Sequence, residues 1–130
     1  MEVLKIARTK STPEILFDPA SNKLRIEGQS YPENAFKFYE PVLQWLDQFL
    51  QQTKEPIFLE IYFNMPYINT SSAKCIMMFL GKLETAYQAG SRVLIRWYYE
   101  RENEMARECA EEFKEDLTVP FEITPVEPDP

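Results

Sequence analysis

Hydrophobic residues recur along the chain with two different periods, and each period predicts one kind of secondary structure. Short apolar runs with a period near two, bounded by turn-forming residues, predict β-strands. Such runs lie at 3–6, 14–18, 23–27, 57–63, 92–98 and 119–123. The second and third runs are separated by a short turn, which predicts an antiparallel hairpin. The run at 57–63 is almost continuously apolar, which predicts a strand buried on both faces.

Apolar residues spaced three and four apart predict three helices. The first is expected to begin only after Pro41, with a short turn over 34–40, because proline removes a backbone donor and clashes with the preceding helical turn. The second helix is expected over 72–89 and the third over 102–116. The residues expected on their apolar faces are Ala73, Ile76, Met77, Leu80, Leu83 and Tyr87 in the second helix, and Met105, Cys109 and Phe113 in the third.

After the hairpin, strands and helices alternate along the chain. This alternation predicts parallel strands joined by right-handed crossovers, and the hairpin makes the sheet mixed. The fold class is therefore α/β, with helices packed against a twisted mixed β-sheet. The 130 residues suffice for one domain, expected over 1–123. The segment 124–130 has three prolines and two acidic residues, and an extended tail is expected there.

The chain contains no histidine, which excludes several classes of functional site. Ser-His-Asp and Cys-His nucleophilic sites, histidine-ligated zinc and phosphohistidine relays all need this residue. The three glycines lie too far apart for a phosphate-binding loop, and the carboxylates show no metal-ligand spacing. We therefore expect no enzyme, no metal site and no cofactor.

The chain has 14 basic and 21 acidic residues, and this excess of acidic residues indicates which class of partner it binds. A formal charge of -7 disfavours nucleic acid and anionic membranes, which bind positive surfaces, and favours a protein partner with basic residues. No signal-peptide pattern and no apolar run long enough to span a bilayer are found. The two cysteines lie among helix-forming residues, so reduced thiols and a cytoplasmic location are expected.

The segment Asn69–Ser72 lies between the strand predicted at 57–63 and the helix that follows it. The start of a helix offers unpaired N–H groups and a partial positive charge, both of which favour an anion such as a phosphoryl group. The hydroxyls of Thr70, Ser71 and Ser72 are possible substrates of a kinase. Serine and threonine are also common helix caps, each worth about 1 kcal/mol. Capping accounts for one hydroxyl, so both interpretations stay open.

Five stretches of the chain resemble the SiaC family of regulatory phosphoproteins, in matching order and spacing over nearly the whole length. They are Lys10–Glu14 (KSTPE), Gly28–Asn34 (GQSYPEN), Tyr67–Ser72 (YINTSS), Arg96–Glu100 (RWYYE) and Ala110–Asp116 (AEEFKED). The resemblance implies a STAS-like domain that is phosphorylated on the threonine of its Asn-Thr-Ser-Ser motif. In this chain that residue is Thr70, and Asn69, Ser71 and Ser72 are its neighbours and expected partner contacts.

The resemblance also implies the partners. A dedicated serine/threonine kinase adds the phosphate, a PP2C-type phosphatase removes it, and the unphosphorylated form activates a diguanylate cyclase, which raises cyclic di-GMP and favours biofilm formation. One alternative within the same fold class is an anti-sigma-factor antagonist in a partner-switching cascade. An alternative of another class is an α/β domain that binds a small ligand beyond its strand ends.

Overall fold

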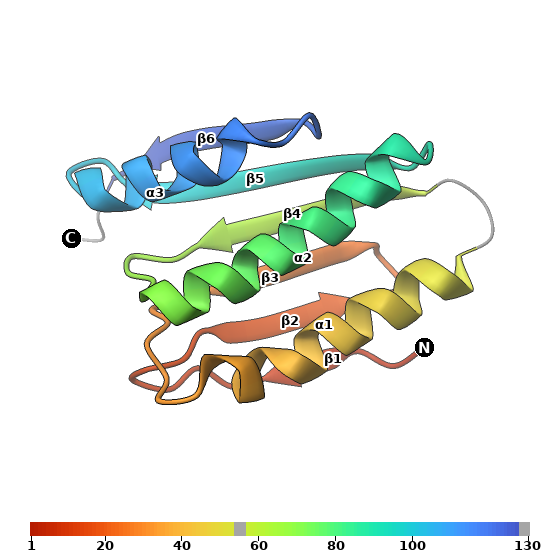
Figure 1. Ribbon diagram of the computed structural model, residues 1–130, viewed down its shortest axis with the longest axis horizontal. Helices are drawn as coiled ribbons and strands as arrows, with labels where there is room; N and C mark the ends of the chain where they lie inside the picture. The colour runs from red at the N-terminus through yellow and green to blue at the C-terminus, as the bar shows by residue number, and fades with distance from the viewer. Residues whose placement is uncertain (54–56, 128–130) are drawn as a thin grey trace.

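Six strands form one mixed β-sheet in which spatial order follows chain order (Figure 1). The computed structural model describes residues 1–53 and 57–127. The strands are β1 (Leu4–Ile6), β2 (Glu14–Asp18), β3 (Lys23–Glu27), β4 (Phe58–Asn64), β5 (Arg92–Glu100) and β6 (Phe121–Val126). The first three pair antiparallel and β3 to β6 pair parallel, so the predicted mixed sheet and α/β class are confirmed.

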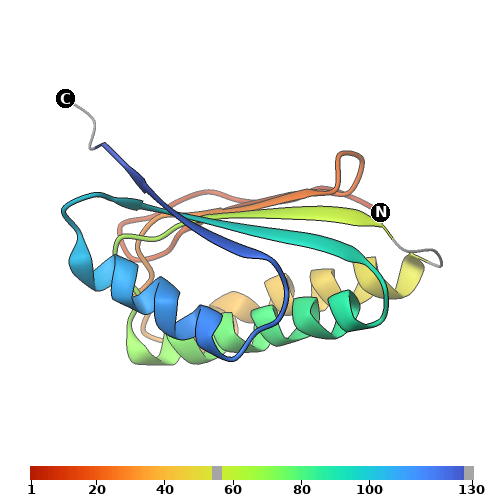
Figure 2. The ribbon, with the colours of Figure 1, turned by 90° about the horizontal axis from the view of Figure 1, so that it is seen from above.

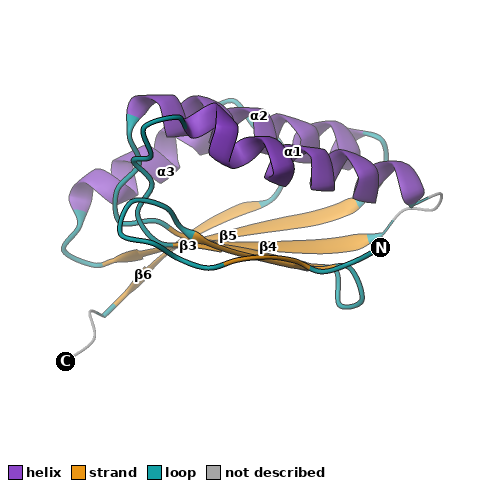
Figure 3. Cartoon of the chain, turned by 90° about the horizontal axis from the view of Figure 1, so that it is seen from below, coloured by secondary structure: helices purple, strands orange, loops and turns teal. Residues whose placement is uncertain are grey.

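Three helices connect the parallel strands in the described part of the chain. They are α1 (Ala35–Gln52), α2 (Thr70–Gln88) and α3 (Glu104–Glu115). All three lie on one face of the sheet, as two views along the sheet show (Figures 2 and 3). Because each helix follows the C-terminal end of a parallel strand, the three helix N-termini lie at the same edge of the sheet (Figure 1). None of these helices is both long and apolar enough to cross a membrane.

The hydrophobic core lies between the sheet and the helices. Strand side chains that face the helices are almost completely buried: Ile15, Phe17, Leu24, Ile26, Leu59, Ile61, Phe63, Val93, Ile95 and Trp97. The opposite face has no helix over it in the described residues (Figure 3). On that face of β4, Phe58 is exposed and Tyr62 is half-buried, so the predicted burial of this strand on both faces is wrong. The apolar composition of β4 did not show whether one face or both faces of this strand are buried.

Pro41 lies inside α1, so the predicted turn over 34–40 and the later helix start are wrong. The helix begins after Asn34, whose side chain accepts a hydrogen bond of 3.1 Å from the backbone N–H of Lys37. Proline deprives the carbonyl four residues earlier, that of Lys37, of its usual donor. Both residues are exposed, so the missing hydrogen bond lies on the solvent side of α1, while the opposite face of the helix is buried.

The C-terminal strand is longer than predicted. β6 reaches Val126, and Thr124 and Pro125 pair with β5, so the first part of the expected tail belongs to the sheet. The sequence also predicts that the first helix ends before Pro56, because proline does not continue a helix. Pro56 lies outside the described residues, as do residues 128–130 of the tail. The remaining strands and helices begin or end within a few residues of their predicted bounds.

Candidate functional site

The loop between β4 and α2 is fixed by backbone hydrogen bonds to the segment that follows β3. The N–H of Ser30 donates to the carbonyl of Tyr67 at 2.8 Å, and the N–H of Asn69 donates to the carbonyl of Ser30 at 2.9 Å. These bonds form an isolated parallel bridge between Ser30 and Ile68. The start of α2 is thus held as an extension of the sheet, which gives the Asn69–Ser72 segment a defined position.

Asn69 is the residue that caps α2. Its side-chain oxygen accepts a hydrogen bond of 2.9 Å from the backbone N–H of Ser72, and its carbonyl accepts one of 2.9 Å from Ala73. Asparagine is among the best N-cap residues, because its short side chain reaches an amide of the first turn. The alternative in which a hydroxyl of Thr70, Ser71 or Ser72 provides the cap is therefore wrong. None of the three hydroxyls is explained by capping.

Ser72 belongs to a buried chain of hydroxyl groups. Ser30 and Ser72 are both 0% exposed, and Oγ of Ser30 donates to Oγ of Ser72 at 2.8 Å. The phenol oxygen of Tyr39 lies 2.7 Å from Oγ of Ser30, and because the Ser30 proton is already used, the phenol is the donor of that bond. Burial raises the pKa of Tyr39 to about 12, so the phenol keeps its proton at neutral pH. Ser72 therefore has a structural role and is inaccessible to a kinase.

Thr70 and Ser71 are both exposed, and they differ in their hydrogen bonds. Oγ of Ser71 donates to the capping oxygen of Asn69 at 3.4 Å. The hydroxyl of Thr70 makes no hydrogen bond within residues 1–53 and 57–127. Thr70 is the first residue of α2, where backbone N–H groups lack intrahelical partners and a negative charge is stabilised. The first turn of α2 contains no acidic residue, and Lys74 follows one turn later.

Five exposed apolar side chains lie on the three helices and in the β4–α2 loop. They are Phe36 at the start of α1, Tyr67 in the β4–α2 loop, Met77 and Met78 on α2, and Met105 at the start of α3. The prediction that Met77 and Met105 lie on buried helix faces is wrong, because each apolar stripe is rotated by about one residue. Ile76, Phe79 and Leu80 are buried in α2, and Ala106, Ala110 and Phe113 in α3. The sequence showed apolar helical positions without showing which of them remain exposed.

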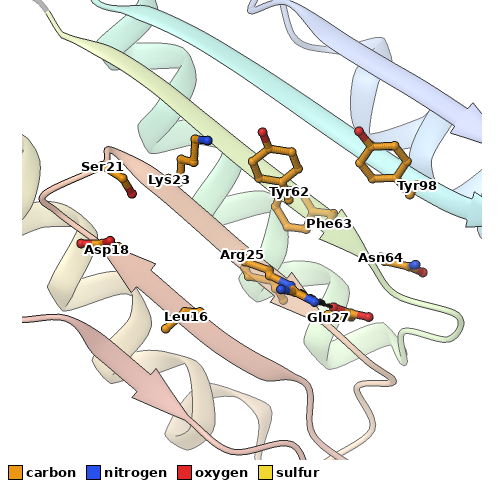
Figure 4. A pocket seen from close by; sticks show the side chains of 11 residues that line it. Leu16, Asp18, Ser21, Lys23, Arg25, Glu27, Tyr62, Phe63, Asn64 and Tyr98 are labelled. Atoms are coloured by element: carbon orange, nitrogen blue, oxygen red, sulfur yellow. Dashed lines mark hydrogen bonds and ion pairs between the residues drawn. The ribbon is translucent and has the colours of Figure 1, made fainter.

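A second candidate is a hollow of about 500 Å³ on the uncovered face of the sheet (Figure 4). The rings of Tyr62 and Tyr98 stand parallel there, with 6.4 Å between their centroids. Charged groups at this face pair with each other: Arg25 binds Glu27, and the phenol of Tyr62 donates to Glu60 at 2.7 Å. Lys23 and Asp18 also line the hollow, and neither makes an ion pair within the described residues, so the hollow presents one charge of each sign and no cluster of a single sign.

The described residues offer neither a metal site nor a reactive thiol. No group of three or more histidine, cysteine or carboxylate side chains is placed to hold a metal ion there. Cys75 is buried, Cys109 is half-buried, and both are free thiols. Burial raises the pKa of each thiol, so both stay protonated and unreactive at neutral pH.

Comparisons with known proteins agree on one family. The sequence model described as "SiaC family regulatory phosphoprotein" matches residues 6–126. An uncharacterised protein of Pseudomonas aeruginosa strain UCBPP-PA14 is 43% identical over 123 residues, which cover 95% of this chain and 96% of the relative.

Solved structures give the same result. The crystal structure of apo-SiaC from Pseudomonas aeruginosa superposes with a TM-score of 0.89 at 41% identity, covering 95% of this chain and 99% of that one. A structure of the diguanylate cyclase SiaD in complex with its activator SiaC, from the same organism, contains a chain with the same TM-score, identity and coverage.

Proposed function

The chain belongs to the SiaC family of regulatory phosphoproteins, and on this premise we propose that phosphorylation of Thr70 controls its binding to a diguanylate cyclase. As a member of this family it is a regulator and not an enzyme. Its mixed six-stranded α/β fold matches the SiaC structures, whereas the likeness to STAS domains stays a prediction from the sequence.

The observation that carries this proposal is the difference between the three hydroxyls of the motif. Thr70 is exposed and free of hydrogen bonds to the described residues, whereas Ser72 is enclosed in the core and Ser71 interacts with the cap. A kinase needs an accessible hydroxyl, and Thr70 meets this condition without disturbing the cap of α2. We assign addition of the phosphate to a serine/threonine kinase and its removal to a PP2C-type phosphatase, as the sequence resemblance implies.

The SiaC–SiaD complex supports a cyclase as the partner. SiaC is named there as the activator of SiaD, and this chain shares 41% of its residues with that SiaC over 95% of its length. A cyclase regulator acts where cyclic di-GMP is made, in agreement with the cytoplasmic location expected from the sequence. The alternative of an anti-sigma-factor antagonist has no observation in its favour, and the hollow on the open face has charges of both signs with no cluster that would select one class of small ligand.

A phosphate at Thr70 can supply the energy that a switch needs. Conversion from mostly bound to mostly free requires about 5.5 kcal/mol of differential affinity. A phosphoryl group adds roughly -1.5 to -2 charges. α2 also has the exposed apolar side chains of Met77 and Met78, and an unpaired charge buried in an interface with such side chains costs several kcal/mol. The phosphate therefore weakens binding where the partner places no basic group against it.

The test compares protein that carries phosphothreonine at position 70 with protein that carries it at Thr124, which is exposed on the opposite face of the sheet. Purified SiaD of Pseudomonas aeruginosa is titrated with each form by calorimetry. We expect phosphate at 70 to weaken binding by about 10⁴-fold, the factor that corresponds to 5.5 kcal/mol, and phosphate at 124 to leave it unchanged. The Thr70→Ala variant should bind like the unmodified chain, and Thr70→Glu should be weakened less than the phosphorylated form because a carboxylate has less charge. Equal affinity of all forms would contradict the proposal, as would a failure of unmodified protein to bind SiaD.

A further inference from the structure

The open face of the sheet, opposite the helices, lacks the cover that parallel strands usually have. Parallel strands occur mostly in sheets whose two faces are both covered by other elements. Here β3 to β6 pair parallel, yet the three helices lie on one face, and no element within residues 1–53 and 57–127 covers the other (Figure 3). The parallel part of this sheet therefore has one face that a further layer can cover.

The middle of the open face is apolar and hollowed. Leu16, Tyr62 and Tyr98 line the hollow of about 500 Å³, and all three side chains are half-buried (Figure 4). Phe58, at the start of β4, is 46% exposed, and the guanidinium of Arg92 lies 5.7 Å from the centroid of its ring. These side chains lie outside the helical core, and a second sheet packed on this face would remove them from water.

The charges of the open face nearly cancel, although the chain as a whole is acidic. Strand residues alternate between the two faces, so those between the buried core positions face away from the helices. The basic ones are Lys5, Lys23, Arg25, Arg92 and Arg96. The acidic ones are Glu14, Asp18, Glu27, Glu60, Glu100 and Glu122. Five basic and six acidic side chains leave this face with a net charge of -1, whereas the chain has -7, so repulsion between two copies is weak where these faces meet.

Two charges of opposite sign on this face have no ion-pair partner in the described chain. Asp18 and Lys23 are opposite each other in the β2–β3 register, both line the hollow, and neither makes an ion pair within the described residues. The nearby carboxylate of Glu60 is already bound by Arg96 and Tyr62. When two identical chains are related by a twofold axis, residue i of one contacts residue j of the other, and residue j contacts residue i. Lys23 of each copy can therefore bind Asp18 of the other copy, which satisfies both charges without a partner of different sequence.

We propose that the open faces of two copies of this chain pack together around a twofold axis, with Tyr62 and Tyr98 in the middle and reciprocal Asp18–Lys23 ion pairs beside them. This inference goes beyond the proposed function and is tested separately from it, because the interface lies on the side of the sheet that faces away from the helices. Thr70 belongs to the helical layer and stays exposed in both copies (Figure 2). The dimer therefore presents its two copies of Thr70 on opposite sides.

The experiment measures self-association of the full chain by sedimentation velocity over a range of concentrations. The unmodified chain should convert from monomer to dimer as its concentration rises. Asp18→Lys and Lys23→Asp should each raise the dissociation constant of the dimer about tenfold or more, because each sets like charges against one another. An equimolar mixture of the two variants should recover the affinity of the unmodified chain, since both contacts then join a basic and an acidic side chain. The matched controls Glu40→Lys and Lys37→Asp reverse exposed charges of α1 and should leave the dissociation constant unchanged.

The outcomes that overturn the dimer are equally specific. An unmodified chain that stays monomeric at about 1 mM contradicts it, as does a mixture of the two variants that associates no better than either variant alone. Circular dichroism shows whether each variant keeps the fold, and Tyr98→Thr replaces one that does not. This variant removes apolar surface from the middle of the face and should weaken association about tenfold, whereas Tyr67→Thr in the β4–α2 loop should not. A dimer that none of these substitutions weakens uses another surface and also overturns the proposal.

Discussion

The N-termini of α2 and α3 are built alike but differ in charge. Asn69 caps α2 by accepting from Ser72 at 2.9 Å, and Asn103 caps α3 by accepting from Ala106 at 3.1 Å. The residue after each cap is Thr70 in α2 and Glu104 in α3. One helix therefore begins with a permanent carboxylate and the other with a neutral hydroxyl.

This difference shows why a phosphate at Thr70 suits the fold. Negative charge at the first position of a helix is stabilised by the free N–H groups there. A phosphate on Thr70 reproduces the charge sign that α3 already has in Glu104, so it changes the surface of α2 while the helix itself is retained. A modification that leaves the fold intact and alters a contact surface is what a reversible regulator requires.

The largest expected effect on the free energy of unfolding comes from the buried hydroxyl groups of Tyr39, Ser30 and Ser72. These groups support the start of α2. The pKa of Tyr39 is raised by burial to about 12, from an ordinary value of 10. Its contribution to stability is complete below pH 10 and is lost as pH rises toward 12, because the unfolded state ionises first. We expect a loss of about 2–3 kcal/mol in the free energy of unfolding over this range.

The measurement is urea unfolding at a series of pH values on the unmodified chain and on Tyr39→Phe. The variant lacks this ionisation and should show a smaller decrease between pH 10 and pH 12. Parallel curves for the two proteins would contradict a buried, protonated phenol at the base of α2.

The two asparagine caps allow a direct comparison of the two helices. Asn69→Ala removes one cap and should lower the free energy of unfolding by about 1 kcal/mol. Asn103→Ala should cost more, about 1.5–2 kcal/mol, because its side-chain nitrogen also donates to the carbonyl of Pro66 at 3.1 Å. Chemical denaturation of both variants checks the order, and a larger loss for Asn69→Ala would show that the two termini are not held as the hydrogen bonds indicate.

The smallest expected effect on stability comes from adding a charge to the first residue of α2 and removing the charge from the first residue of α3. Thr70→Glu should stabilise the protein by about 0.3–1 kcal/mol, and Glu104→Gln should destabilise it by a similar amount. Both differences should shrink at high salt, because both positions are exposed. Thermal unfolding at low and high ionic strength measures them. A marked destabilisation by Thr70→Glu would mean that negative charge at this position disturbs the fold.

Most strands and helices could be predicted from the sequence, because the spacing of apolar residues within a short segment indicates which element that segment forms. Pro41 shows the limit of this approach: local sequence predicted a break, and the packing of α1 outweighed one lost hydrogen bond at an exposed position. The phosphorylation of Thr70 stays a prediction. The roles of the other motif residues needed the structure, because Ser72 is paired with Ser30, 42 residues away in the chain. Exposure of Met77 likewise depends on how α2 is rotated over the sheet.

The strand order has a consequence for the synthesis of the protein. Because the strands pair in the order in which they leave the ribosome, no later strand has to be inserted between two that are already paired. Each new helix and strand adds to the edge of the sheet that has already formed, and each parallel pair closes a crossover that contains one helix. Folding can therefore proceed from the N-terminus as the chain emerges, and β6 completes the sheet last.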